Sequence, residues 1–375
     1  MVARQLGNLD ARKDRSSTLL SSATSGSSLT YRTDTSMSRK FFFSMHALVS
    51  NYSSNNITHL LYSSSGVWTV VENIIAGPSA NNLNSIASNM QGSRLIFANY
   101  PGSGIVPLDY NGVTWTAGAL VPNSGGGAAA AVTMSADGLH ALSGGDFSNR
   151  VTPYEFNSST GLWETQSGIV VGSTDLDSVR MTRDGSRALA VGKFGNTAYP
   201  LARNPGTGIW ATSGSPIALN NSGERFFAIG ISVDGSTAIV GSNNVSAHSD
   251  GLIWDGSVWN RVDIPVVING VTWRPDGLSA IGGQGEGESG IIRTINYDPV
   301  TETFSAGQVL TGYGLIGEVA VANDGIGDIA LAADFSANSV IPLSYSRNTQ
   351  LWTPGTPIPS PLFSNPRNLL LFPIW

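Results

Sequence analysis

Short apolar segments alternate with polar turns along most of the chain. In one representative stretch, residues 131–167, four apolar runs are separated by the turn Asp137-Gly138 and by polar loops, and the fourth run contains Trp163. Glycine tolerates the positive φ that tight hairpin turns require. Four short runs joined by such turns predict a four-stranded antiparallel meander.

This unit recurs along the chain at intervals of 45 to 49 residues. An aromatic residue marks the fourth run of each copy: Trp68, Trp115, Trp163, Trp210, Trp259, Phe304 and Trp352. The Asp-Gly turn returns at Asp184, Asp234, Asp276 and Asp324. A repeat of this length with four strands is typical of a propeller blade. The sequence therefore predicts an all-β, seven-bladed β-propeller of four-stranded antiparallel blades, with the repeated aromatic residues packed between blades.

The end of the chain resembles the start of an eighth repeat. Residues 363–375 align with the beginning of a repeat, and the chain then stops. Such a segment can pair with the first blade and remove an exposed edge. We expect the ring to be closed in this way by the C-terminal strands.

Proline recurs at one place in the third run of four copies, at Pro107, Pro153, Pro200 and Pro342. Proline cannot donate a hydrogen bond to a neighbouring strand, so it is confined to strand starts, edges and bulges. We expect the third strand to begin at or just after this proline, or to bulge there.

Charge divides the chain into two parts. Residues 1–40 carry a net charge of +4, whereas the whole chain carries −6, so the remainder carries −10. Residues 16–28 are rich in Ser and Thr and lack periodicity. We expect residues 1–33 to form an irregular N-terminal arm before a propeller at 34–375. The arm is either a tail without a role or a docking arm that orders on a partner. Its candidate docking residues are Arg4, Arg12, Lys13 and Arg15.

Composition excludes several classes of protein. Charged residues make up only 12% of the chain, about half the usual share. Cysteine is absent, which excludes disulfides and thiolate metal sites. No run of 18 apolar residues occurs, so we expect no membrane insertion. The acidic ring argues against nucleic-acid binding, and so does the arm, which has only one aromatic residue, Tyr31, among its cations.

No motif carries a clear chemistry. The four histidines show no metal-binding spacing, and we expect them to lie in different repeats. Residues 285–290 match G-x-G-x-x-G, but a strand rather than a helix is expected to follow, so we interpret them as a loop. Residues 323–328 resemble a calcium loop only vaguely and already form an Asp-Gly turn. We therefore expect no catalytic residue, cofactor or metal.

The loops between the second and third strands are the best candidates for binding, because they vary most in length between repeats. The alternative, which we prefer, is that these loops vary in length without a role. The candidate residues are Asp146, Asn149, Arg150, Asn243, His248, Asp250, Gln284, Glu286 and Glu288.

The Asp-Gly segments 135–138, 232–235 and 274–277, each followed by a strand with a small residue, resemble the repeats of WD40-like propellers. No Trp-Asp pair closes the blades and no Gly-His pair opens them, so the resemblance is to the broad class and implies fold more than function. The sequence segments 157–163 and 297–304 resemble segments of propellers from tailed-bacteriophage virions.

That resemblance implies a non-catalytic structural or adhesion component of a virion, such as a tail, fibre or decoration protein. The arm would dock to the particle, and the ring would bind other virion proteins, copies of itself, a host-surface receptor or a glycan. Two alternatives remain open. One is a cytoplasmic, cellular WD40-like interaction scaffold. The other is a metal-dependent propeller hydrolase or lactonase.

Overall fold

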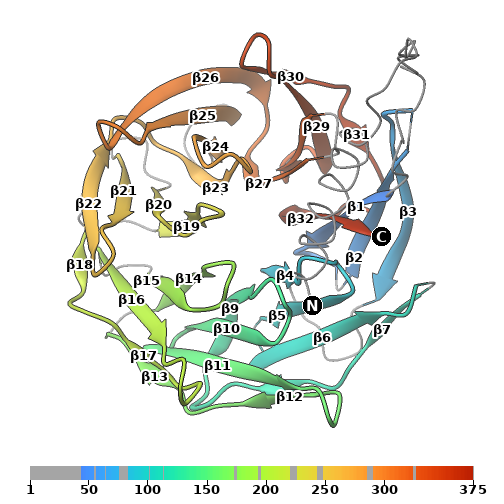
Figure 1. The fold of residues 1–375 in the computed structure, drawn as a ribbon. Coiled ribbons are helices and arrows are strands. Elements are labelled where there is room, and N and C mark those ends of the chain that lie inside the picture. The colour runs from blue at the N-terminus through green and yellow to red at the C-terminus, as the bar shows by residue number, and fades with distance from the viewer. Residues whose placement is uncertain are drawn as a thin grey trace, which may run out of the picture. The chain divides into compact units, whose positions relative to one another are not determined.

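The described part of the chain is built almost entirely from short antiparallel strands. The computed structural model describes residues 44–374 except 55, 64, 76–82, 101, 113, 173–174, 193–195, 220–225, 243–247, 285–289 and 324–326. These residues form seven antiparallel sheets arranged around a common centre (Figure 1). The predicted N-terminal arm, residues 1–33, lies outside the described residues.

Each sheet is one blade, and its strands follow one another from the centre outward. Blade 1 contains β32 (Pro366–Ile374), β1 (Ser44–Asn51), β2 (Asn56–Tyr62) and β3 (Trp68–Ile75). Blade 2 contains β4 (Ile86–Ser88), β5 (Arg94–Asn99), β6 (Gly104–Tyr110), β7 (Trp115–Ala117) and β8 (Val121–Pro122). Blade 3 contains β9 (Ala128–Met134), β10 (His140–Asp146), β11 (Arg150–Asn157), β12 (Leu162–Thr165) and β13 (Ile169–Val170).

The remaining blades follow the same order. Blade 4 contains β14 (Leu176–Met181), β15 (Arg187–Gly192), β16 (Thr197–Arg203), β17 (Trp210–Thr212) and β18 (Ile217–Ala218). Blade 5 contains β19 (Phe226–Ile231), β20 (Thr237–Ser242), β21 (Ser249–Trp254) and β22 (Trp259–Ile264). Blade 6 contains β23 (Asn269–Trp273), β24 (Ser279–Gln284), β25 (Gly290–Asp298) and β26 (Thr303–Tyr313). Blade 7 contains β27 (Ile316–Asn323), β28 (Asp328–Asp334), β29 (Ser339–Ser346), β30 (Leu351–Pro354) and β31 (Ile358–Pro359).

The prediction of a seven-bladed propeller closed by its C-terminal strand is confirmed. β32 pairs antiparallel with β1 and becomes the innermost strand of blade 1. It also contacts the innermost strands of both neighbouring blades, β4 and β27. The two ends of the described chain therefore share one sheet, which joins the first blade to the last part of the chain.

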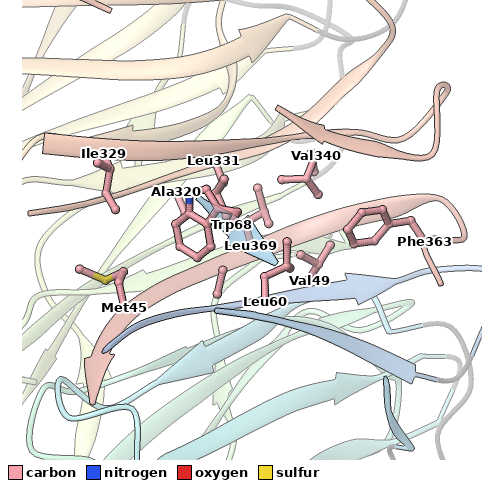
Figure 2. Close-up of a cluster of buried hydrophobic side chains, with 12 residues drawn as sticks. Met45, Val49, Leu60, Trp68, Ala320, Ile329, Leu331, Val340, Phe363 and Leu369 are labelled. Atoms are coloured by element: carbon pink, nitrogen blue, oxygen red, sulfur yellow. The ribbon is translucent and has the colours of Figure 1, made fainter. Parts of the chain in front are cut away.

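The repeated aromatic residues pack between blades, as the sequence predicts. Each lies within or against a different buried cluster that joins its own blade to the preceding one. At the closing seam, Trp68 of blade 1 packs with Leu331 and Val340 of blade 7 and with Leu369 of β32 (Figure 2). Burial of apolar side chains between blades thus supplies most of the core.

The Asp-Gly turns connect the first and second strands of their blades. In blade 3, Asp137 Oδ1 accepts hydrogen bonds from Leu139 N at 2.9 Å and from Ser135 Oγ at 2.6 Å. Gly138 adopts a φ of 71°, a conformation that favours glycine. Asp thus closes the turn with its side chain, and Gly supplies the backbone geometry. The turn at Asp324-Gly325 lies outside the described residues.

The expectation for the recurring proline is wrong. Pro107 lies in the middle of β6, and β6 pairs with β5 without a shift in register. The proline carbonyl faces outward and accepts a 2.8 Å hydrogen bond from Gly118 N, so its nitrogen also faces the outermost strand. That outer strand is the one that breaks, into β7 and β8.

The same break occurs in every blade that carries this proline. Pro153, Pro200 and Pro342 also lie inside their strands, and their outer strands are split into β12 and β13, β17 and β18, and β30 and β31. Blades 1, 5 and 6 lack the proline, and their outer strands β3, β22 and β26 are continuous. Proline has no N–H group to donate to the outermost strand. It is therefore the outermost strand that breaks, and the strand that contains the proline stays continuous.

Candidate functional site

The inner strands of all seven blades enclose a cavity of about 340 Å³. We call it the upper cavity. It is lined mainly by residues at or near the starts of the inner strands and in the loops between second and third strands. A second space of about 200 Å³, the lower cavity, is lined mainly by the later residues of several of the same strands. The two cavities together follow the centre of the ring.

Small residues at the inner-strand positions leave room for the upper cavity. Ala130, Ala228 and Gly270 occupy its wall in three different blades. Gly270 has a φ of 37°, and a side chain there would collide with the carbonyl oxygen of Gly317 in the next blade. Close approach of blades 6 and 7 therefore requires glycine at this position.

An ion pair across the channel separates the two cavities. Arg180 of β14 and Glu318 of β27 line both of them, and Arg180 Nη2 lies 3.3 Å from Glu318 Oε1. Arg180 Nε also donates to Ile229 O in blade 5 at 3.0 Å, and Leu369 N of blade 1 donates to Glu318 Oε2 at 3.3 Å. The pair therefore connects four blades across the centre of the ring.

Burial raises the pKa of Glu318 above the ordinary carboxyl range, and the positive charge of Arg180 opposes part of that rise. Both carboxylate oxygens have a hydrogen-bond donor. A buried carboxylate held in this way stabilises the arrangement of the blades, and it also has the perturbed pKa that is common at functional sites.

A second cation lies on the wall of the upper cavity formed by blades 7, 1 and 2. The Cζ atom of Arg367 in β32 lies 3.9 Å from the ring centroid of Tyr52 and 5.9 Å from that of Phe335. Its Nη1 donates a long hydrogen bond of 3.5 Å to Asn84 Oδ1. The side chain is thus positioned by two aromatic rings and an amide.

The predicted binding loop of blade 3 reaches this cavity. Asp146 lines it, is almost fully buried, and accepts a 3.2 Å hydrogen bond from Phe147 N. Phe147 is exposed and has a φ of 59°, a strained conformation for a bulky residue. Asn149 and Arg150 lie beside it but do not line the cavity: Asn149 O accepts from Val171 N at 3.0 Å, and Arg150 N donates to Ser148 Oγ at 3.2 Å.

The other predicted binding residues do not line the upper cavity. His248 is exposed, whereas Asp250 is fully buried and forms a 3.0 Å ion pair with Arg261. Gln284 is buried at the end of β24. Asn243, Glu286 and Glu288 lie outside the described residues, as do the arm residues Arg4, Arg12, Lys13 and Arg15.

The expectation that the four histidines lie in different repeats is wrong for two of them. His46 of β1 and His59 of β2 share blade 1, where His46 Nδ1 lies 2.7 Å from His59 Nε2. His59 Nδ1 in turn lies 3.4 Å from Glu72 Oε1 of β3. Among the described residues, no group of three or more His, Asp or Glu side chains is placed to hold a metal ion. No described helix has the length and hydrophobicity of a membrane span.

Sequence reasoning missed Arg180, Glu318 and Arg367. The available signal is clearest for Glu318, the single charge in the mainly apolar segment 316–323, whereas the segment of Arg180, 176–181, also contains Asp177. The corresponding positions of other blades are small or apolar, for example Ala131 and Gly230. Arg180 and Glu318 themselves line both cavities of the channel.

Comparison with known proteins confirms the fold. No family model and no curated protein matches the sequence. A putative 6-phosphogluconolactonase from Bacteroides uniformis matches with a TM-score of 0.72 and 12% identity over 88% of this chain and 99% of its own. The corresponding protein from Bacteroides fragilis has a TM-score of 0.71 and 13% identity over 88% and 98%. The periplasmic gluconolactonase of Pseudomonas aeruginosa has a TM-score of 0.69 and 14% identity over 88% and 99%.

These neighbours are lactonase-like propellers and not phage proteins. At such low identity, the likeness shows the fold alone. The seven-bladed propeller is therefore established by the comparison. The similarity in style to virion propellers has no support from it, and the assignment to a phage particle stays a proposal.

Proposed function

We propose that this chain is a non-catalytic binding and assembly protein of a bacteriophage particle. In this proposal the N-terminal arm docks to the virion, and the face that carries the loops between second and third strands binds another virion protein, a further copy of the chain or a host-surface receptor. The principal support is the Arg180–Glu318 pair. Its charges are committed to connections among four blades, which suits a rigid scaffold rather than a reacting group.

Composition supports the same proposal. The turns are rich in small polar residues and charge is low, which is compatible with dense packing of many copies. Weak contacts gain strength through multivalency when copies are held in an array. The exposed Phe147, held in a strained conformation at a loop tip, provides an aromatic anchor of the type found at binding hot spots.

The test is the location of the full-length chain in its native source. Lysates would be separated on a density gradient, and the chain would be followed by mass spectrometry together with virion morphology. We expect it to sediment with intact particles and to remain there after a high-salt wash. Recovery only as a free protein, or bound to a cytoplasmic host protein, would replace the virion role with that of a cellular interaction scaffold.

A lactone hydrolase is the second candidate, favoured by the raised pKa of Glu318 at the boundary of two cavities. Hydrolysis of a lactone consumes one water and releases an acid, so it can be followed as proton release. Purified protein would be incubated with glucono-δ-lactone and with its 6-phosphate, beside the variant Glu318→Gln. Our proposal expects only the uncatalysed rate. Turnover by the native chain that disappears in the variant would establish an enzyme instead.

A further inference from the structure

Arg367 differs from the other arginine of the channel in its partners. Arg180 has a carboxylate partner 3.3 Å away, as described above. Arg367 has none among the described residues: its contacts are the rings of Tyr52 and Phe335 and the amide oxygen of Asn84. Aromatic rings contact the flat faces of a guanidinium, and the N–H groups lie on its edges. Such an edge matches the two oxygens of a carboxylate.

Two asparagine side chains, Asn368 and Asn269, also line the upper cavity. Asn368 Oδ1 accepts a 3.3 Å hydrogen bond from Ile86 N, and Asn269 Oδ1 accepts one of 2.9 Å from Gly270 N. Both amides are thereby fixed by their oxygens, and the structure gives their Nδ2 groups no partner among the described residues. These groups line the cavity as donors for the hydroxyl or carbonyl oxygens of a ligand.

Charge is distributed unequally around the cavity. The cation Arg367 lies on blade 1, and the carboxylate of Asp146 lies on blade 3, two blades away around the ring. The Arg180–Glu318 pair forms the floor and is electrically balanced. A ligand with one anionic end and several hydroxyl groups suits the cation and the amide groups described above.

We propose that the upper cavity binds the carboxylate of an acidic sugar residue, with Arg367 as the group that recognises it. The cavity of about 340 Å³ lies at the small end of ligand pockets, which span about 300–1,000 Å³. A cavity of this size suits a single sugar residue rather than a long oligosaccharide. This inference rests on the proposed function, in which a host-surface glycan is one receptor, and it names the chemistry that would be recognised.

Two kinds of ligand carry such a carboxylate: a glycan with an acidic end and a free sugar acid. Full-length protein would be titrated calorimetrically with sialyllactose, with gluconate and with neutral lactose, at low and at physiological salt. We expect sialyllactose to bind and lactose to bind at least tenfold more weakly. Binding of gluconate with equal affinity would overturn the glycan source and favour the free acid.

Three variants and one competing ligand test whether sialyllactose binds in the upper cavity through Arg367. Arg367→Gln is expected to weaken sialyllactose binding by at least tenfold, and Arg367→Lys to weaken it less, because lysine keeps the charge but loses the planar edge. Arg347→Gln removes an exposed arginine outside the cavity and is expected to bind like the native chain. Inorganic phosphate is expected to compete only weakly. Equal competition by phosphate, or affinity unchanged in Arg367→Gln, would overturn the proposal.

The circular dichroism spectrum and melting temperature of each variant separate lost binding from lost folding. The result is also distinct from that of the virion test. Absence of sugar binding by a chain that sediments with particles rejects this inference alone, whereas sugar binding by a chain that never joins a particle rejects the virion role.

Discussion

Arg94 of blade 2 donates a 2.9 Å hydrogen bond from Nη1 to the backbone oxygen of Gly138 in the Asp-Gly turn of blade 3. Its Cζ atom also lies 3.4 Å from the ring centroid of Phe156 in blade 3. Arg187 repeats the arrangement between blades 4 and 5, with a 3.2 Å hydrogen bond to Gly235 O and a distance of 4.3 Å to the ring of Trp254. In blades 2 and 4, the first residue of the second strand thus connects its blade to the Asp-Gly turn of the next blade.

Replacement of Arg94 by Met should destabilise the ring. A hydrogen bond from a charged donor contributes about 1.5–3 kcal/mol and a cation–π contact about 0.5–2 kcal/mol, and the two share one side chain, so we expect a loss of about 1–3 kcal/mol. Urea unfolding followed by tryptophan fluorescence measures it. Arg347→Met, at an exposed position, should change stability by less than about 0.5 kcal/mol. Equal effects of the two substitutions would contradict the interblade tie.

Removal of residues 369–375 should abolish the cooperative unfolding transition. Leu369 packs in the cluster between blades 7 and 1, and Phe372 packs in the one between blades 1 and 2. The truncation therefore strips the inner strand of blade 1 and opens two clusters. The single substitution Leu369→Ala should retain the fold and cost about 2–5 kcal/mol. Calorimetry compares the three chains, and a truncated chain that melts at the native temperature would refute the closure.

Acid should weaken blade 1 through the His46–His59 pair. Burial, reinforced by the neighbouring His59, lowers the pKa of His46 from 6.5 to about 4. Burial also lowers the pKa of His59, although Glu72 opposes this. A depressed pKa means that the folded state binds the proton less readily than the unfolded state. Stability from these groups is therefore present above pH 6.5 and is lost as the pH falls toward 4.

The variant His46→Asn should show a smaller decline of the free energy of unfolding between pH 6.5 and 4 than the native chain. His248→Asn is the matched control at an exposed histidine and should keep the native slope. Glu318 acts in the opposite direction, because its raised pKa favours the folded state at low pH. The test therefore compares slopes between variants. Identical slopes for His46→Asn and the native chain would remove the histidine pair as the cause.

A methyl group at Gly251 should destabilise the seam between blades 5 and 6. A Cβ atom there would collide with the ring of Phe304, the aromatic mark of blade 6. Overpacking of this kind costs about 1–3 kcal/mol. The control is Gly355→Ala, where the added atom would make ordinary contacts. In the double variant with Phe304→Leu, thermal unfolding should show a total loss smaller than the sum of the single losses, and strict additivity would argue against the contact.

Repetition made the fold readable from the sequence. The Asp137-Gly138 turn and the Trp163 mark each depend on a few neighbouring residues, so the copies that carry them report the same local geometry. The error about Pro107 arose because the consequence of its missing donor falls on a different strand, which begins at Trp115. Neighbouring strands must be considered together before such a residue can be interpreted.

The site was not readable in the same way. Arg180 and Glu318 are separated by 138 residues and meet only because the ring closes. Neither residue has a charged counterpart at the same position in other blades. The sequence repeat that predicts the fold therefore gives no indication of this ion pair. His46 and His59 were assigned to different repeats for a related reason, since the first copy lacks the Asp-Gly turn that would define its strands.

The broken outer strands have a consequence for how this molecule behaves when crowded. A long, unpaired strand edge invites strands of other molecules to add to it, and proline or short edge strands prevent this. Blades 2, 3, 4 and 7 present only short outer segments, whereas β26 of blade 6 is continuous over 11 residues. The rim is thus protected from β-aggregation at these four blades. An extended peptide that pairs with the rim has its longest partner strand at blade 6.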